Sequence, residues 1–183
     1  MRRSLGISEP EAPRVDVTLM RRRHLRGVMA IERQVYSRPW SPNLFLAEMT
    51  EPNNRRYLVA KIDREIVGYG GLITYGDEAH ITNVAVDPMH QGHGIATRLL
   101  AELIPNAIEM GARAVSLEVR VTNWGAQRIY ARFGFRPVGI RRNYYQEVSE
   151  DALIMWTDDV RTEAYRHRLD RIEETLVEGV RPG

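Results

Sequence analysis

The chain has 183 residues, of which 43% are hydrophobic and 27% are charged, a composition typical of one soluble globular domain with its own core. It contains no cysteine, which excludes disulfides, thiolate nucleophiles and cysteine-based metal sites. The 26 basic and 24 acidic residues nearly balance, and no uncharged apolar run is long enough to span a bilayer. We therefore expect a cytoplasmic protein without a nucleic-acid or membrane partner.

The first part of the chain predicts a tail, a strand and two helices. Residues 1–14 are mostly polar and contain two prolines, so we expect a disordered tail. Residues 15–20 alternate between apolar and polar and predict a short strand. Apolar residues recur at helical spacing through 22–36, which predicts a helix. The Ser-Pro pair at 41–42 suits an N-cap and a first helical position, so a second helix is expected over 42–51.

Three strands and a third helix follow. The apolar runs at 57–62 and 65–74 are separated by two polar residues and predict a tight hairpin. A third strand is expected over 79–87. A glycine-bearing turn at 91–96 then opens a helix, and a glycine after its last apolar residue suits a C-terminal cap. Pro105 lies inside this helical pattern, so we expect a kink or a break there.

The rest of the chain predicts a strand, a helix and a closing hairpin. Residues 114–121 alternate strictly, and Asn123 can cap a helix that ends at Gly134. Strands over 135–146 and 151–157 should pair with each other. The late strand–helix–strand steps imply some parallel pairing. We therefore expect an α/β protein (α+β in some schemes) with a mixed sheet and helices on both faces.

The C-terminal residues 159–183 are expected to add a helix to a domain that covers residues 15–158. The helix has a one-sided apolar stripe among charged residues. Two interpretations stay open: the stripe packs on its own domain, or it forms a dimer contact. Two heptads make only a weak coiled coil, so a monomer or a weak dimer is expected. The stripe consists of Tyr165, Leu169, Ile172 and Leu176.

The turn at 91–96 has the features of an anion site. It joins a strand directly to a helix, whose first backbone N–H groups have no partner within the helix. The helix dipole adds partial positive charge at the same place. Gly92 and Gly94 carry no side chain, so phosphate oxygens can approach the backbone closely. Glycines in such turns are often only structural, and the turn lacks the lysine and the serine or threonine of a P-loop.

The strand at 114–121 carries a carboxylate in an unusual position. Ser116, Glu118 and Arg120 face one side of it, and valines and a leucine face the other. A sheet covered on both faces should not hold a carboxylate at its middle without a purpose, so we expect Glu118 to line a cleft. The alternative is a carboxylate on an exposed face, or one neutralised by Arg120 or another cation.

Several motifs together resemble a known family. Gln91-x-x-Gly94-x-Ala96 resembles the coenzyme A pyrophosphate loop of the GCN5-related N-acetyltransferases (GNAT). Leu-Glu-Val-Arg-Val-x-Asn at 117–123, then Ala-x-x-x-Tyr-x-x-x-Gly-Phe at 126–135, then the segments at 141–145 and 150–155 resemble the ribosomal-protein-alanine N-acetyltransferase branch. The resemblance runs from about Val84 to Trp156. It implies a mostly antiparallel sheet of about seven strands.

The resemblance also implies a cosubstrate and roles for named residues. Acetyl-coenzyme A would donate the acetyl group directly, in a ternary complex, to the free N-terminus of a protein, and the expected substrate is the N-terminal alanine of a small-subunit ribosomal protein. Glu118 would be the base, and Tyr130 would protonate the leaving thiolate. Both roles agree with ordinary side-chain pKa values, although Tyr130 in a helix is equally compatible with a core aromatic. The implied cofactor-binding residues are Val84, Ala85, Val86, Gln91, Gly92, His93, Gly94, Ile95, Ala96, Thr97 and Asn123.

Weaker expectations concern the substrate peptide, metals and other activities. His80, His90 and His93 are irregularly spaced, so no metal site is expected, and no Ser-His-Asp arrangement is visible. Acetylation of a lysine side chain or a small amine, and a non-catalytic coenzyme A-binding module, remain alternative functions. The aromatic residues that could contact the peptide, or simply belong to the core, are Tyr36, Trp40, Tyr144 and Tyr145.

Overall fold

The structure is a computed structural model that describes residues 14–177, so the expected tail lies almost wholly outside the described residues. Seven strands form one sheet in the order β1-β2-β3-β4-β5-β7-β6. Only β4 and β5 pair in parallel, and all other neighbours are antiparallel. The strands are β1 (Val15–Leu19), β2 (Arg55–Ile62), β3 (Glu65–Tyr75), β4 (Glu78–Val86), β5 (Ala114–Arg120), β6 (Arg136–Tyr145) and β7 (Glu150–Trp156).

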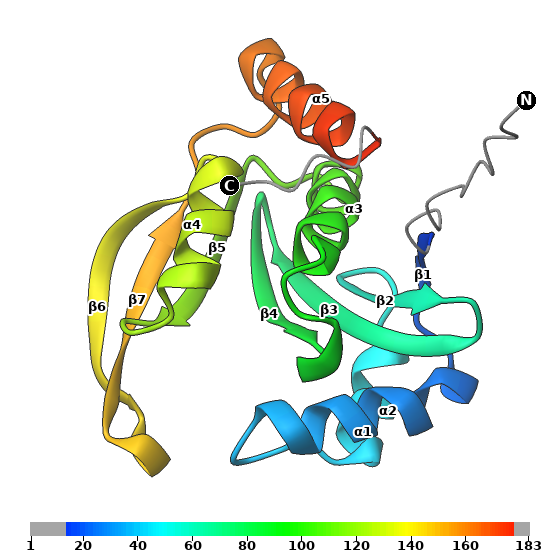
Figure 1. Ribbon diagram of the computed structural model, residues 1–183. Helices are drawn as coiled ribbons and strands as arrows, with labels where there is room; N and C mark the ends of the chain where they lie inside the picture. Colours follow the sequence, from blue (N-terminus) through cyan, green and yellow to red (C-terminus); the bar gives the residue numbers. More distant parts are fainter. Residues whose placement is uncertain (1–13, 178–183) are drawn as a thin grey trace, which may run out of the picture.

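Helices cover both faces of this sheet, as expected (Figure 1). On one face, α1 (Leu25–Val35) and α2 (Pro42–Met49) form a core with residues of β2, β3 and β4. On the other face, α3 (Ile95–Glu109) and α4 (Trp124–Arg132) form the larger core, to which α5 (Glu163–Val177) contributes. Short 3-10 turns occupy Arg22–His24, Pro88–His90 and Gln146–Val148. The central strands β2 and β3 are thus buried on both sides, which explains their apolar runs.

The local signals at the helix ends act as expected. The Ser41 side chain accepts a hydrogen bond from the Leu44 N–H (3.2 Å) ahead of Pro42 at the first helical position. The Asn123 side chain accepts one from the Ala126 N–H (3.1 Å) at the start of α4. These two caps place the segments before α2 and α4, both of which reach the cavity described below.

The expected break at Pro105 is wrong, because α3 continues through this residue to Glu109. Pro105 has no N–H to donate to the preceding turn. The Asn106 side-chain amide instead donates to the Glu102 carbonyl (2.8 Å), and the neighbouring Ile104 and Ala107 are fully buried. Burial of this face in the core outweighs the intrinsic cost of one proline.

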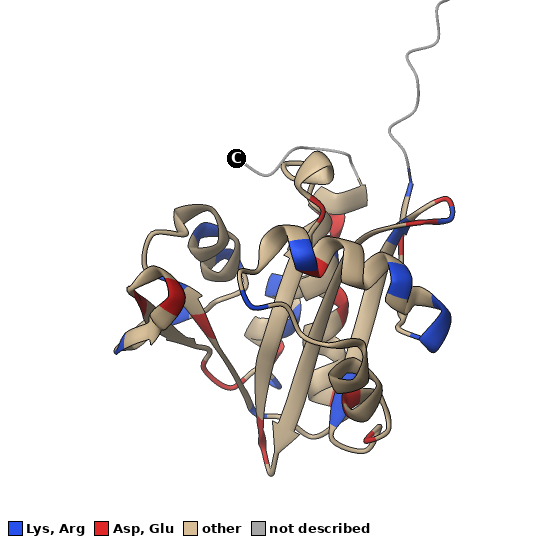
Figure 2. Cartoon of the chain, turned by 90° about the horizontal axis from the view of Figure 1, so that it is seen from below, with Lys and Arg blue, Asp and Glu red and all other residues tan. Residues whose placement is uncertain are grey.

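The C-terminal helix packs against its own chain. Tyr165, Leu169 and Ile172 are buried in the larger core, and Leu176 is partly buried beside it. Three of the four stripe residues are therefore buried within one molecule, so the apolar stripe is explained without a dimer contact. Charged residues of both signs are spread over the molecule rather than gathered on one face (Figure 2). Among the helices of residues 14–177, none is long and apolar enough to cross a membrane.

Candidate active site

The central feature of the candidate site is the divergence of β4 from β5. The two strands pair only from Glu78 with Ala114 to Ile81 with Leu117. Beyond that point β4 carries an extra residue, Thr82, because Gly71 pairs with Asn83 while Leu72 pairs with Ile81. A cavity of about 420 Å³ lies here, lined by both strands and by segments around α1, α4 and the β6–β7 connection.

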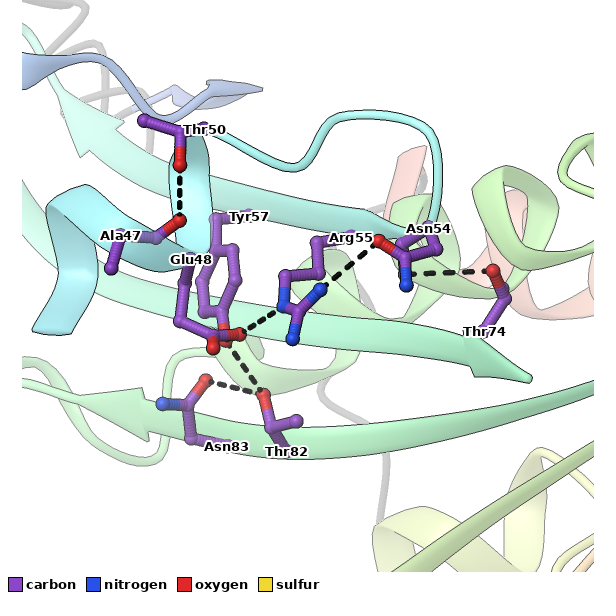
Figure 3. Close-up of polar contacts among 9 residues, drawn as sticks. All are labelled: Ala47, Glu48, Thr50, Asn54, Arg55, Tyr57, Thr74, Thr82 and Asn83. Atoms are coloured by element: carbon purple, nitrogen blue, oxygen red, sulfur yellow. Dashed lines mark hydrogen bonds and ion pairs between the residues drawn. The ribbon is translucent and has the colours of Figure 1, made fainter.

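A polar network fixes β4 where it leaves β5 (Figure 3). The Glu48 carboxylate on α2 accepts hydrogen bonds from Arg55 Nε (2.8 Å) and from the Tyr57 hydroxyl (3.0 Å). The same hydroxyl lies 3.3 Å from Thr82 Oγ1, and Thr82 donates to Asn83 Oδ1 (3.4 Å). Burial is the main cause that raises the pKa of Tyr57, so the phenol stays protonated and can donate. The network ties α2 to the irregular part of β4.

Glu118 lines the cavity, as expected, and it also contacts His80 and Arg141. Its side chain is only 9% exposed. One carboxylate oxygen lies 2.9 Å from His80 Nε2, and the other lies 3.3 Å from Arg141 Nε. The hydrogen bond to His80 is the main reason that the pKa of Glu118 is below its ordinary value, and Arg141 adds to it against the opposing effect of burial. Glu118 is therefore an anion at neutral pH.

His80 has a role that the sequence analysis missed. Its Nδ1 lies 3.0 Å from Ser116 Oγ, while its Nε2 faces Glu118. The chain Ser116–His80–Glu118 thus exists, although no serine–histidine–acid arrangement was expected. The parallel register places His80 opposite Ser116, and Glu118 follows two residues later on the same face. Ser116 also lies within donor distance of the Ala79 carbonyl (3.4 Å), so its hydroxyl is held by the sheet.

Tyr130 lies on α4, lines the cavity and is 9% exposed. Its ring packs against Phe135 at 5.9 Å between centroids. Within residues 14–177 no hydrogen-bond partner is found for its hydroxyl. Burial raises the pKa of Tyr130, with the nearby Tyr145 as a smaller cause. Tyr130 is thus a core aromatic and, at the same time, a protonated phenol at the cavity wall.

The aromatic residues expected at the peptide all line this cavity. Tyr144 is 45% exposed, and Arg141 lies 5.7 Å from its ring centroid. Arg120 lies 5.0 Å from the ring of Tyr145, whose pKa burial raises to about 12. Unlike Tyr144 and Tyr145, Trp40 also packs on Phe45 in the core, with 5.2 Å between the ring centroids. The four residues are Tyr36, Trp40, Tyr144 and Tyr145.

A second residue missed from the sequence is Glu32 on α1. It is 2% exposed, lines the cavity and accepts hydrogen bonds from the Trp40 N–H (2.7 Å) and the Tyr69 hydroxyl. Burial raises its pKa, against the effect of the Trp40 N–H. Glu32 lies on the apolar stripe of its helix, four residues after Val28. A carboxylate at such a position could have indicated a buried acidic residue from the sequence alone. It holds the segment between α1 and α2 at the cavity.

The turn before α3 presents backbone amides without side-chain obstruction. Gly94 is the N-cap in the left-handed region (φ 75°), and no side chain caps the helix. A Cβ added at Gly92 would meet nothing within 4 Å. Among the described residues, no acceptor is found for the N–H groups from Gly92 to Thr97. This cradle fits a pyrophosphate, which accepts several hydrogen bonds.

The other expected cofactor-binding residues differ in what they can offer. Val84 and Asn123 line the cavity, whereas the side chains of Ala85 and Val86 are buried in the two cores. Ile95 and Thr97 are each 1% exposed, so they can contribute only backbone groups. Gln91 donates to the Val86 carbonyl (3.3 Å) and shapes the turn. Within residues 14–177, no group of three or more histidine or acidic side chains is placed to hold a metal ion.

Comparisons with known proteins agree with this geometry. The model of the acetyltransferase (GNAT) family matches residues 25–135. A Bacillus subtilis (strain 168) protein, named as a candidate [ribosomal protein bS18]-alanine N-acetyltransferase, is 40% identical over 75% of this chain and 91% of its own. The N-alpha-acetyltransferase RimI of Mycobacterium tuberculosis is 39% identical over 66% of this chain and 76% of its own. The solved ribosomal-protein-S18-alanine N-acetyltransferase of Escherichia coli superposes with a TM-score of 0.72 at 29% identity, covering 80% of this chain and 94% of that one.

Proposed function

Because the chain belongs to the acetyltransferase (GNAT) family, we propose that it transfers the acetyl group of acetyl-coenzyme A to the free α-amino group of a protein N-terminus. By its similarity to relatives named for ribosomal protein bS18, the proposed substrate is the N-terminal alanine of that small-subunit protein. The proposed acetyltransferase unit covers residues 15–158. The observation that carries the proposal is one cavity, at the divergence of β4 and β5, that Glu118 and Tyr130 both face.

The coenzyme A thioester supplies the acetyl group, and the residues of the chain position and assist it. The amides from Gly92 to Thr97 would hold the pyrophosphate. Asn123 and the main chain near Val84 would hold the arm that enters the cavity. Backbone N–H groups of 84–86 are the proposed donors to the thioester oxygen.

Glu118 would take part in removing a proton from the incoming amine. As an anion in a largely buried position, it attracts the ammonium form of an N-terminus. An α-amino group has a pKa of about 7.7–8.0, against about 10.4 for lysine, so an N-terminus loses its proton more easily by roughly 3.4 kcal/mol. A carboxylate with a lowered pKa is a weak base, and that favours the more acidic of the two amines.

Tyr130 would protonate the departing sulfur. The raised pKa of its phenol guarantees that a proton is present throughout the neutral range. The same burial makes the Tyr130 phenol a weaker acid and so a poorer proton donor. This loss is compensated only if the coenzyme A thiolate is also poorly solvated, because a poorly solvated thiolate is a stronger base. The 9% exposure of Tyr130 fits such a dry environment.

A direct test compares three peptides with acetyl-coenzyme A. One has the N-terminus of bS18 and no lysine, the second has a blocked N-terminus and one lysine, and the third has neither free amine. We expect acetylation of the first alone, detected by mass spectrometry as the mass gain of one acetyl group. Acetylation of only the lysine peptide would refute the N-terminal proposal. Coenzyme A binding without any transfer would favour a non-catalytic module.

A further inference from the structure

The C-terminal helix α5 lies across α3 and α4 (Figure 1). At the end of α4, the Tyr165 hydroxyl donates to the Phe133 carbonyl (2.7 Å), and Arg168 donates to the Arg132 carbonyl (3.1 Å). These bonds, together with the buried side chains, hold the first three turns of α5 firmly. The helix therefore brings its last turn, Thr175 to Val177, to a defined place.

That place is beside the proposed phosphate-binding turn. The Leu176 carbonyl accepts a hydrogen bond from Arg98 Nη2 (2.7 Å), and Arg98 belongs to the first turn of α3. A Cβ added at Gly94 would lie 3.9 Å from Leu176 Cδ2. Thr175 Oγ1 lies 3.5 Å from Arg132 Nη2. The end of α5 and the start of α3 thus meet at Gly94, inside the amide cradle, and at Arg98, which follows it.

The charges at this contact oppose an incoming phosphate. A helix C-terminus carries partial negative charge, and cations there are stabilising. The last turn of α5 has no basic residue of its own, and Glu173 and Glu174 are exposed just before it. Among the described residues, the cation at this place is Arg98, from another helix. A phosphate at the cradle would bring more negative charge to the same guanidinium.

We propose that Arg98 is a phosphate ligand of the coenzyme A site, and that the last turn of α5 competes with the phosphate for it. This inference rests on the proposed function. Guanidinium groups bind phosphate with charge-assisted, often paired hydrogen bonds, which are stronger than a single bond to a neutral carbonyl. Phosphate binding would draw Arg98 from the Leu176 carbonyl and loosen the last turn. By linkage, loosening that turn first must strengthen coenzyme A binding by the same factor.

The test is calorimetric titration of coenzyme A into the full chain and two variants. Leu176→Ala removes the side chain that anchors the last turn, while alanine keeps the helix propensity high. Val177→Thr is the matched control, because Val177 is 85% exposed and threonine, which is also β-branched, has about the same helix propensity as valine. We expect Leu176→Ala to lower the Kd about fivefold, at the low end of ordinary coupling between sites, and Val177→Thr to leave it unchanged.

Arg98→Gln separates the two parts of the proposal. We expect this variant to bind coenzyme A more weakly than the parent chain, and we expect the gain from Leu176→Ala to vanish in the double variant. Hydrogen exchange gives a second measurement on the unaltered chain: coenzyme A should speed exchange of the amides at the end of α5. Equal Kd values for the parent chain and Leu176→Ala, or slower exchange with ligand, would overturn the competition.

The outcomes distinguish this inference from the proposed function. If coenzyme A binds the parent chain and Leu176→Ala equally well, the acetyltransferase proposal stands and the role of α5 is refuted. If coenzyme A binds none of the folded chains, both fail together. If Arg98→Gln binds as tightly as the parent, Arg98 is no ligand.

Discussion

Glu118 must stay ionised to attract the amine, yet a carboxylate that stays ionised easily is a weak base. Its contacts with His80 and Arg141 keep it ionised, because the hydrogen bond to His80 and the charge of Arg141 both lower its pKa. The same contacts make it a weak base, so it should not store a proton taken from an amine. We expect the proton to leave through a water molecule or through His80, with Glu118 holding the amine in place.

Removing His80 should alter the pH profile of the enzyme. Because the hydrogen bond from His80 lowers the pKa of Glu118, His80→Leu should raise that pKa. Glu118 then becomes protonated at a higher pH as the pH falls. Below about pH 8 the substrate amine already protonates and kcat/KM declines. A second, steeper decline of kcat/KM is expected at the lower pH where Glu118 itself becomes protonated. This second decline should begin at higher pH in His80→Leu than in the parent chain.

His80→Gln is the control for that experiment, because an amide can still donate to the carboxylate. It should move the steeper decline less than His80→Leu does. If both variants lose activity by one constant factor at every pH, the effect of His80 on the pKa of Glu118 is disproved.

Tyr130 permits a test with almost no change in shape. Tyr130→Phe removes the hydroxyl, for which no partner is found within residues 14–177, and keeps the ring contact with Phe135. We expect kcat to fall on the order of 100-fold, the usual range for loss of a general acid, with unchanged coenzyme A affinity and thermal stability. Stopped-flow measurement of thiol release would record the loss, and retention of full turnover would remove Tyr130 from the chemistry.

At the scale of elements, most helices and strands could be predicted from local patterns. Caps such as Ser41 and Asn123 act within four residues, so the sequence alone reveals them. The path of α3 through Pro105 could not be read this way, since tertiary burial decides it. Likewise, Glu118 was predictable from strand alternation, whereas its partner His80 depends on the register between two strands 36 residues apart.

The turn before α3 gives a prediction about backbone conformation. Gly94 has φ 75°, a region that costs a residue with a side chain roughly 1–3 kcal/mol. Gly94→Ala should therefore lower the free energy of unfolding by about that amount and distort the amide cradle. We expect coenzyme A to bind up to about tenfold more weakly, as measured by calorimetry.

Gly76→Ala provides the comparison. Gly76 also has positive φ (61°) with free space around it, but it lies in the turn between β3 and β4, outside the cradle and the cavity. Gly76→Ala should lower the free energy of unfolding by a similar amount and leave the affinity for coenzyme A unchanged. Equal weakening of coenzyme A binding in both variants would mean that strain, rather than the cradle, is responsible.

At the scale of the whole molecule, few contacts join the part that carries β4 to the part that carries β5. β4 and β5 share only a four-residue pairing, and α5 bridges α3 to the end of α4. Beside the cavity, the Ser37 hydroxyl donates to Glu147 (3.2 Å), which joins the segment after α1 to the segment after β6. A ligand between the strands would add contacts to both sides at once.

This architecture predicts strong thermal stabilisation by coenzyme A. A ligand at about 100 times its Kd adds about 2.7 kcal/mol to the free energy of unfolding. For a chain of this size, each kcal/mol raises Tm by roughly 2–4 °C, so we expect a rise of about 5–10 °C in scanning calorimetry. Glu118→Gln should show the same rise, because Glu118 acts on the amine and not on the cosubstrate. A normal rise with lost turnover in that variant would separate binding from chemistry, whereas a lost rise would place Glu118 in the cofactor site instead.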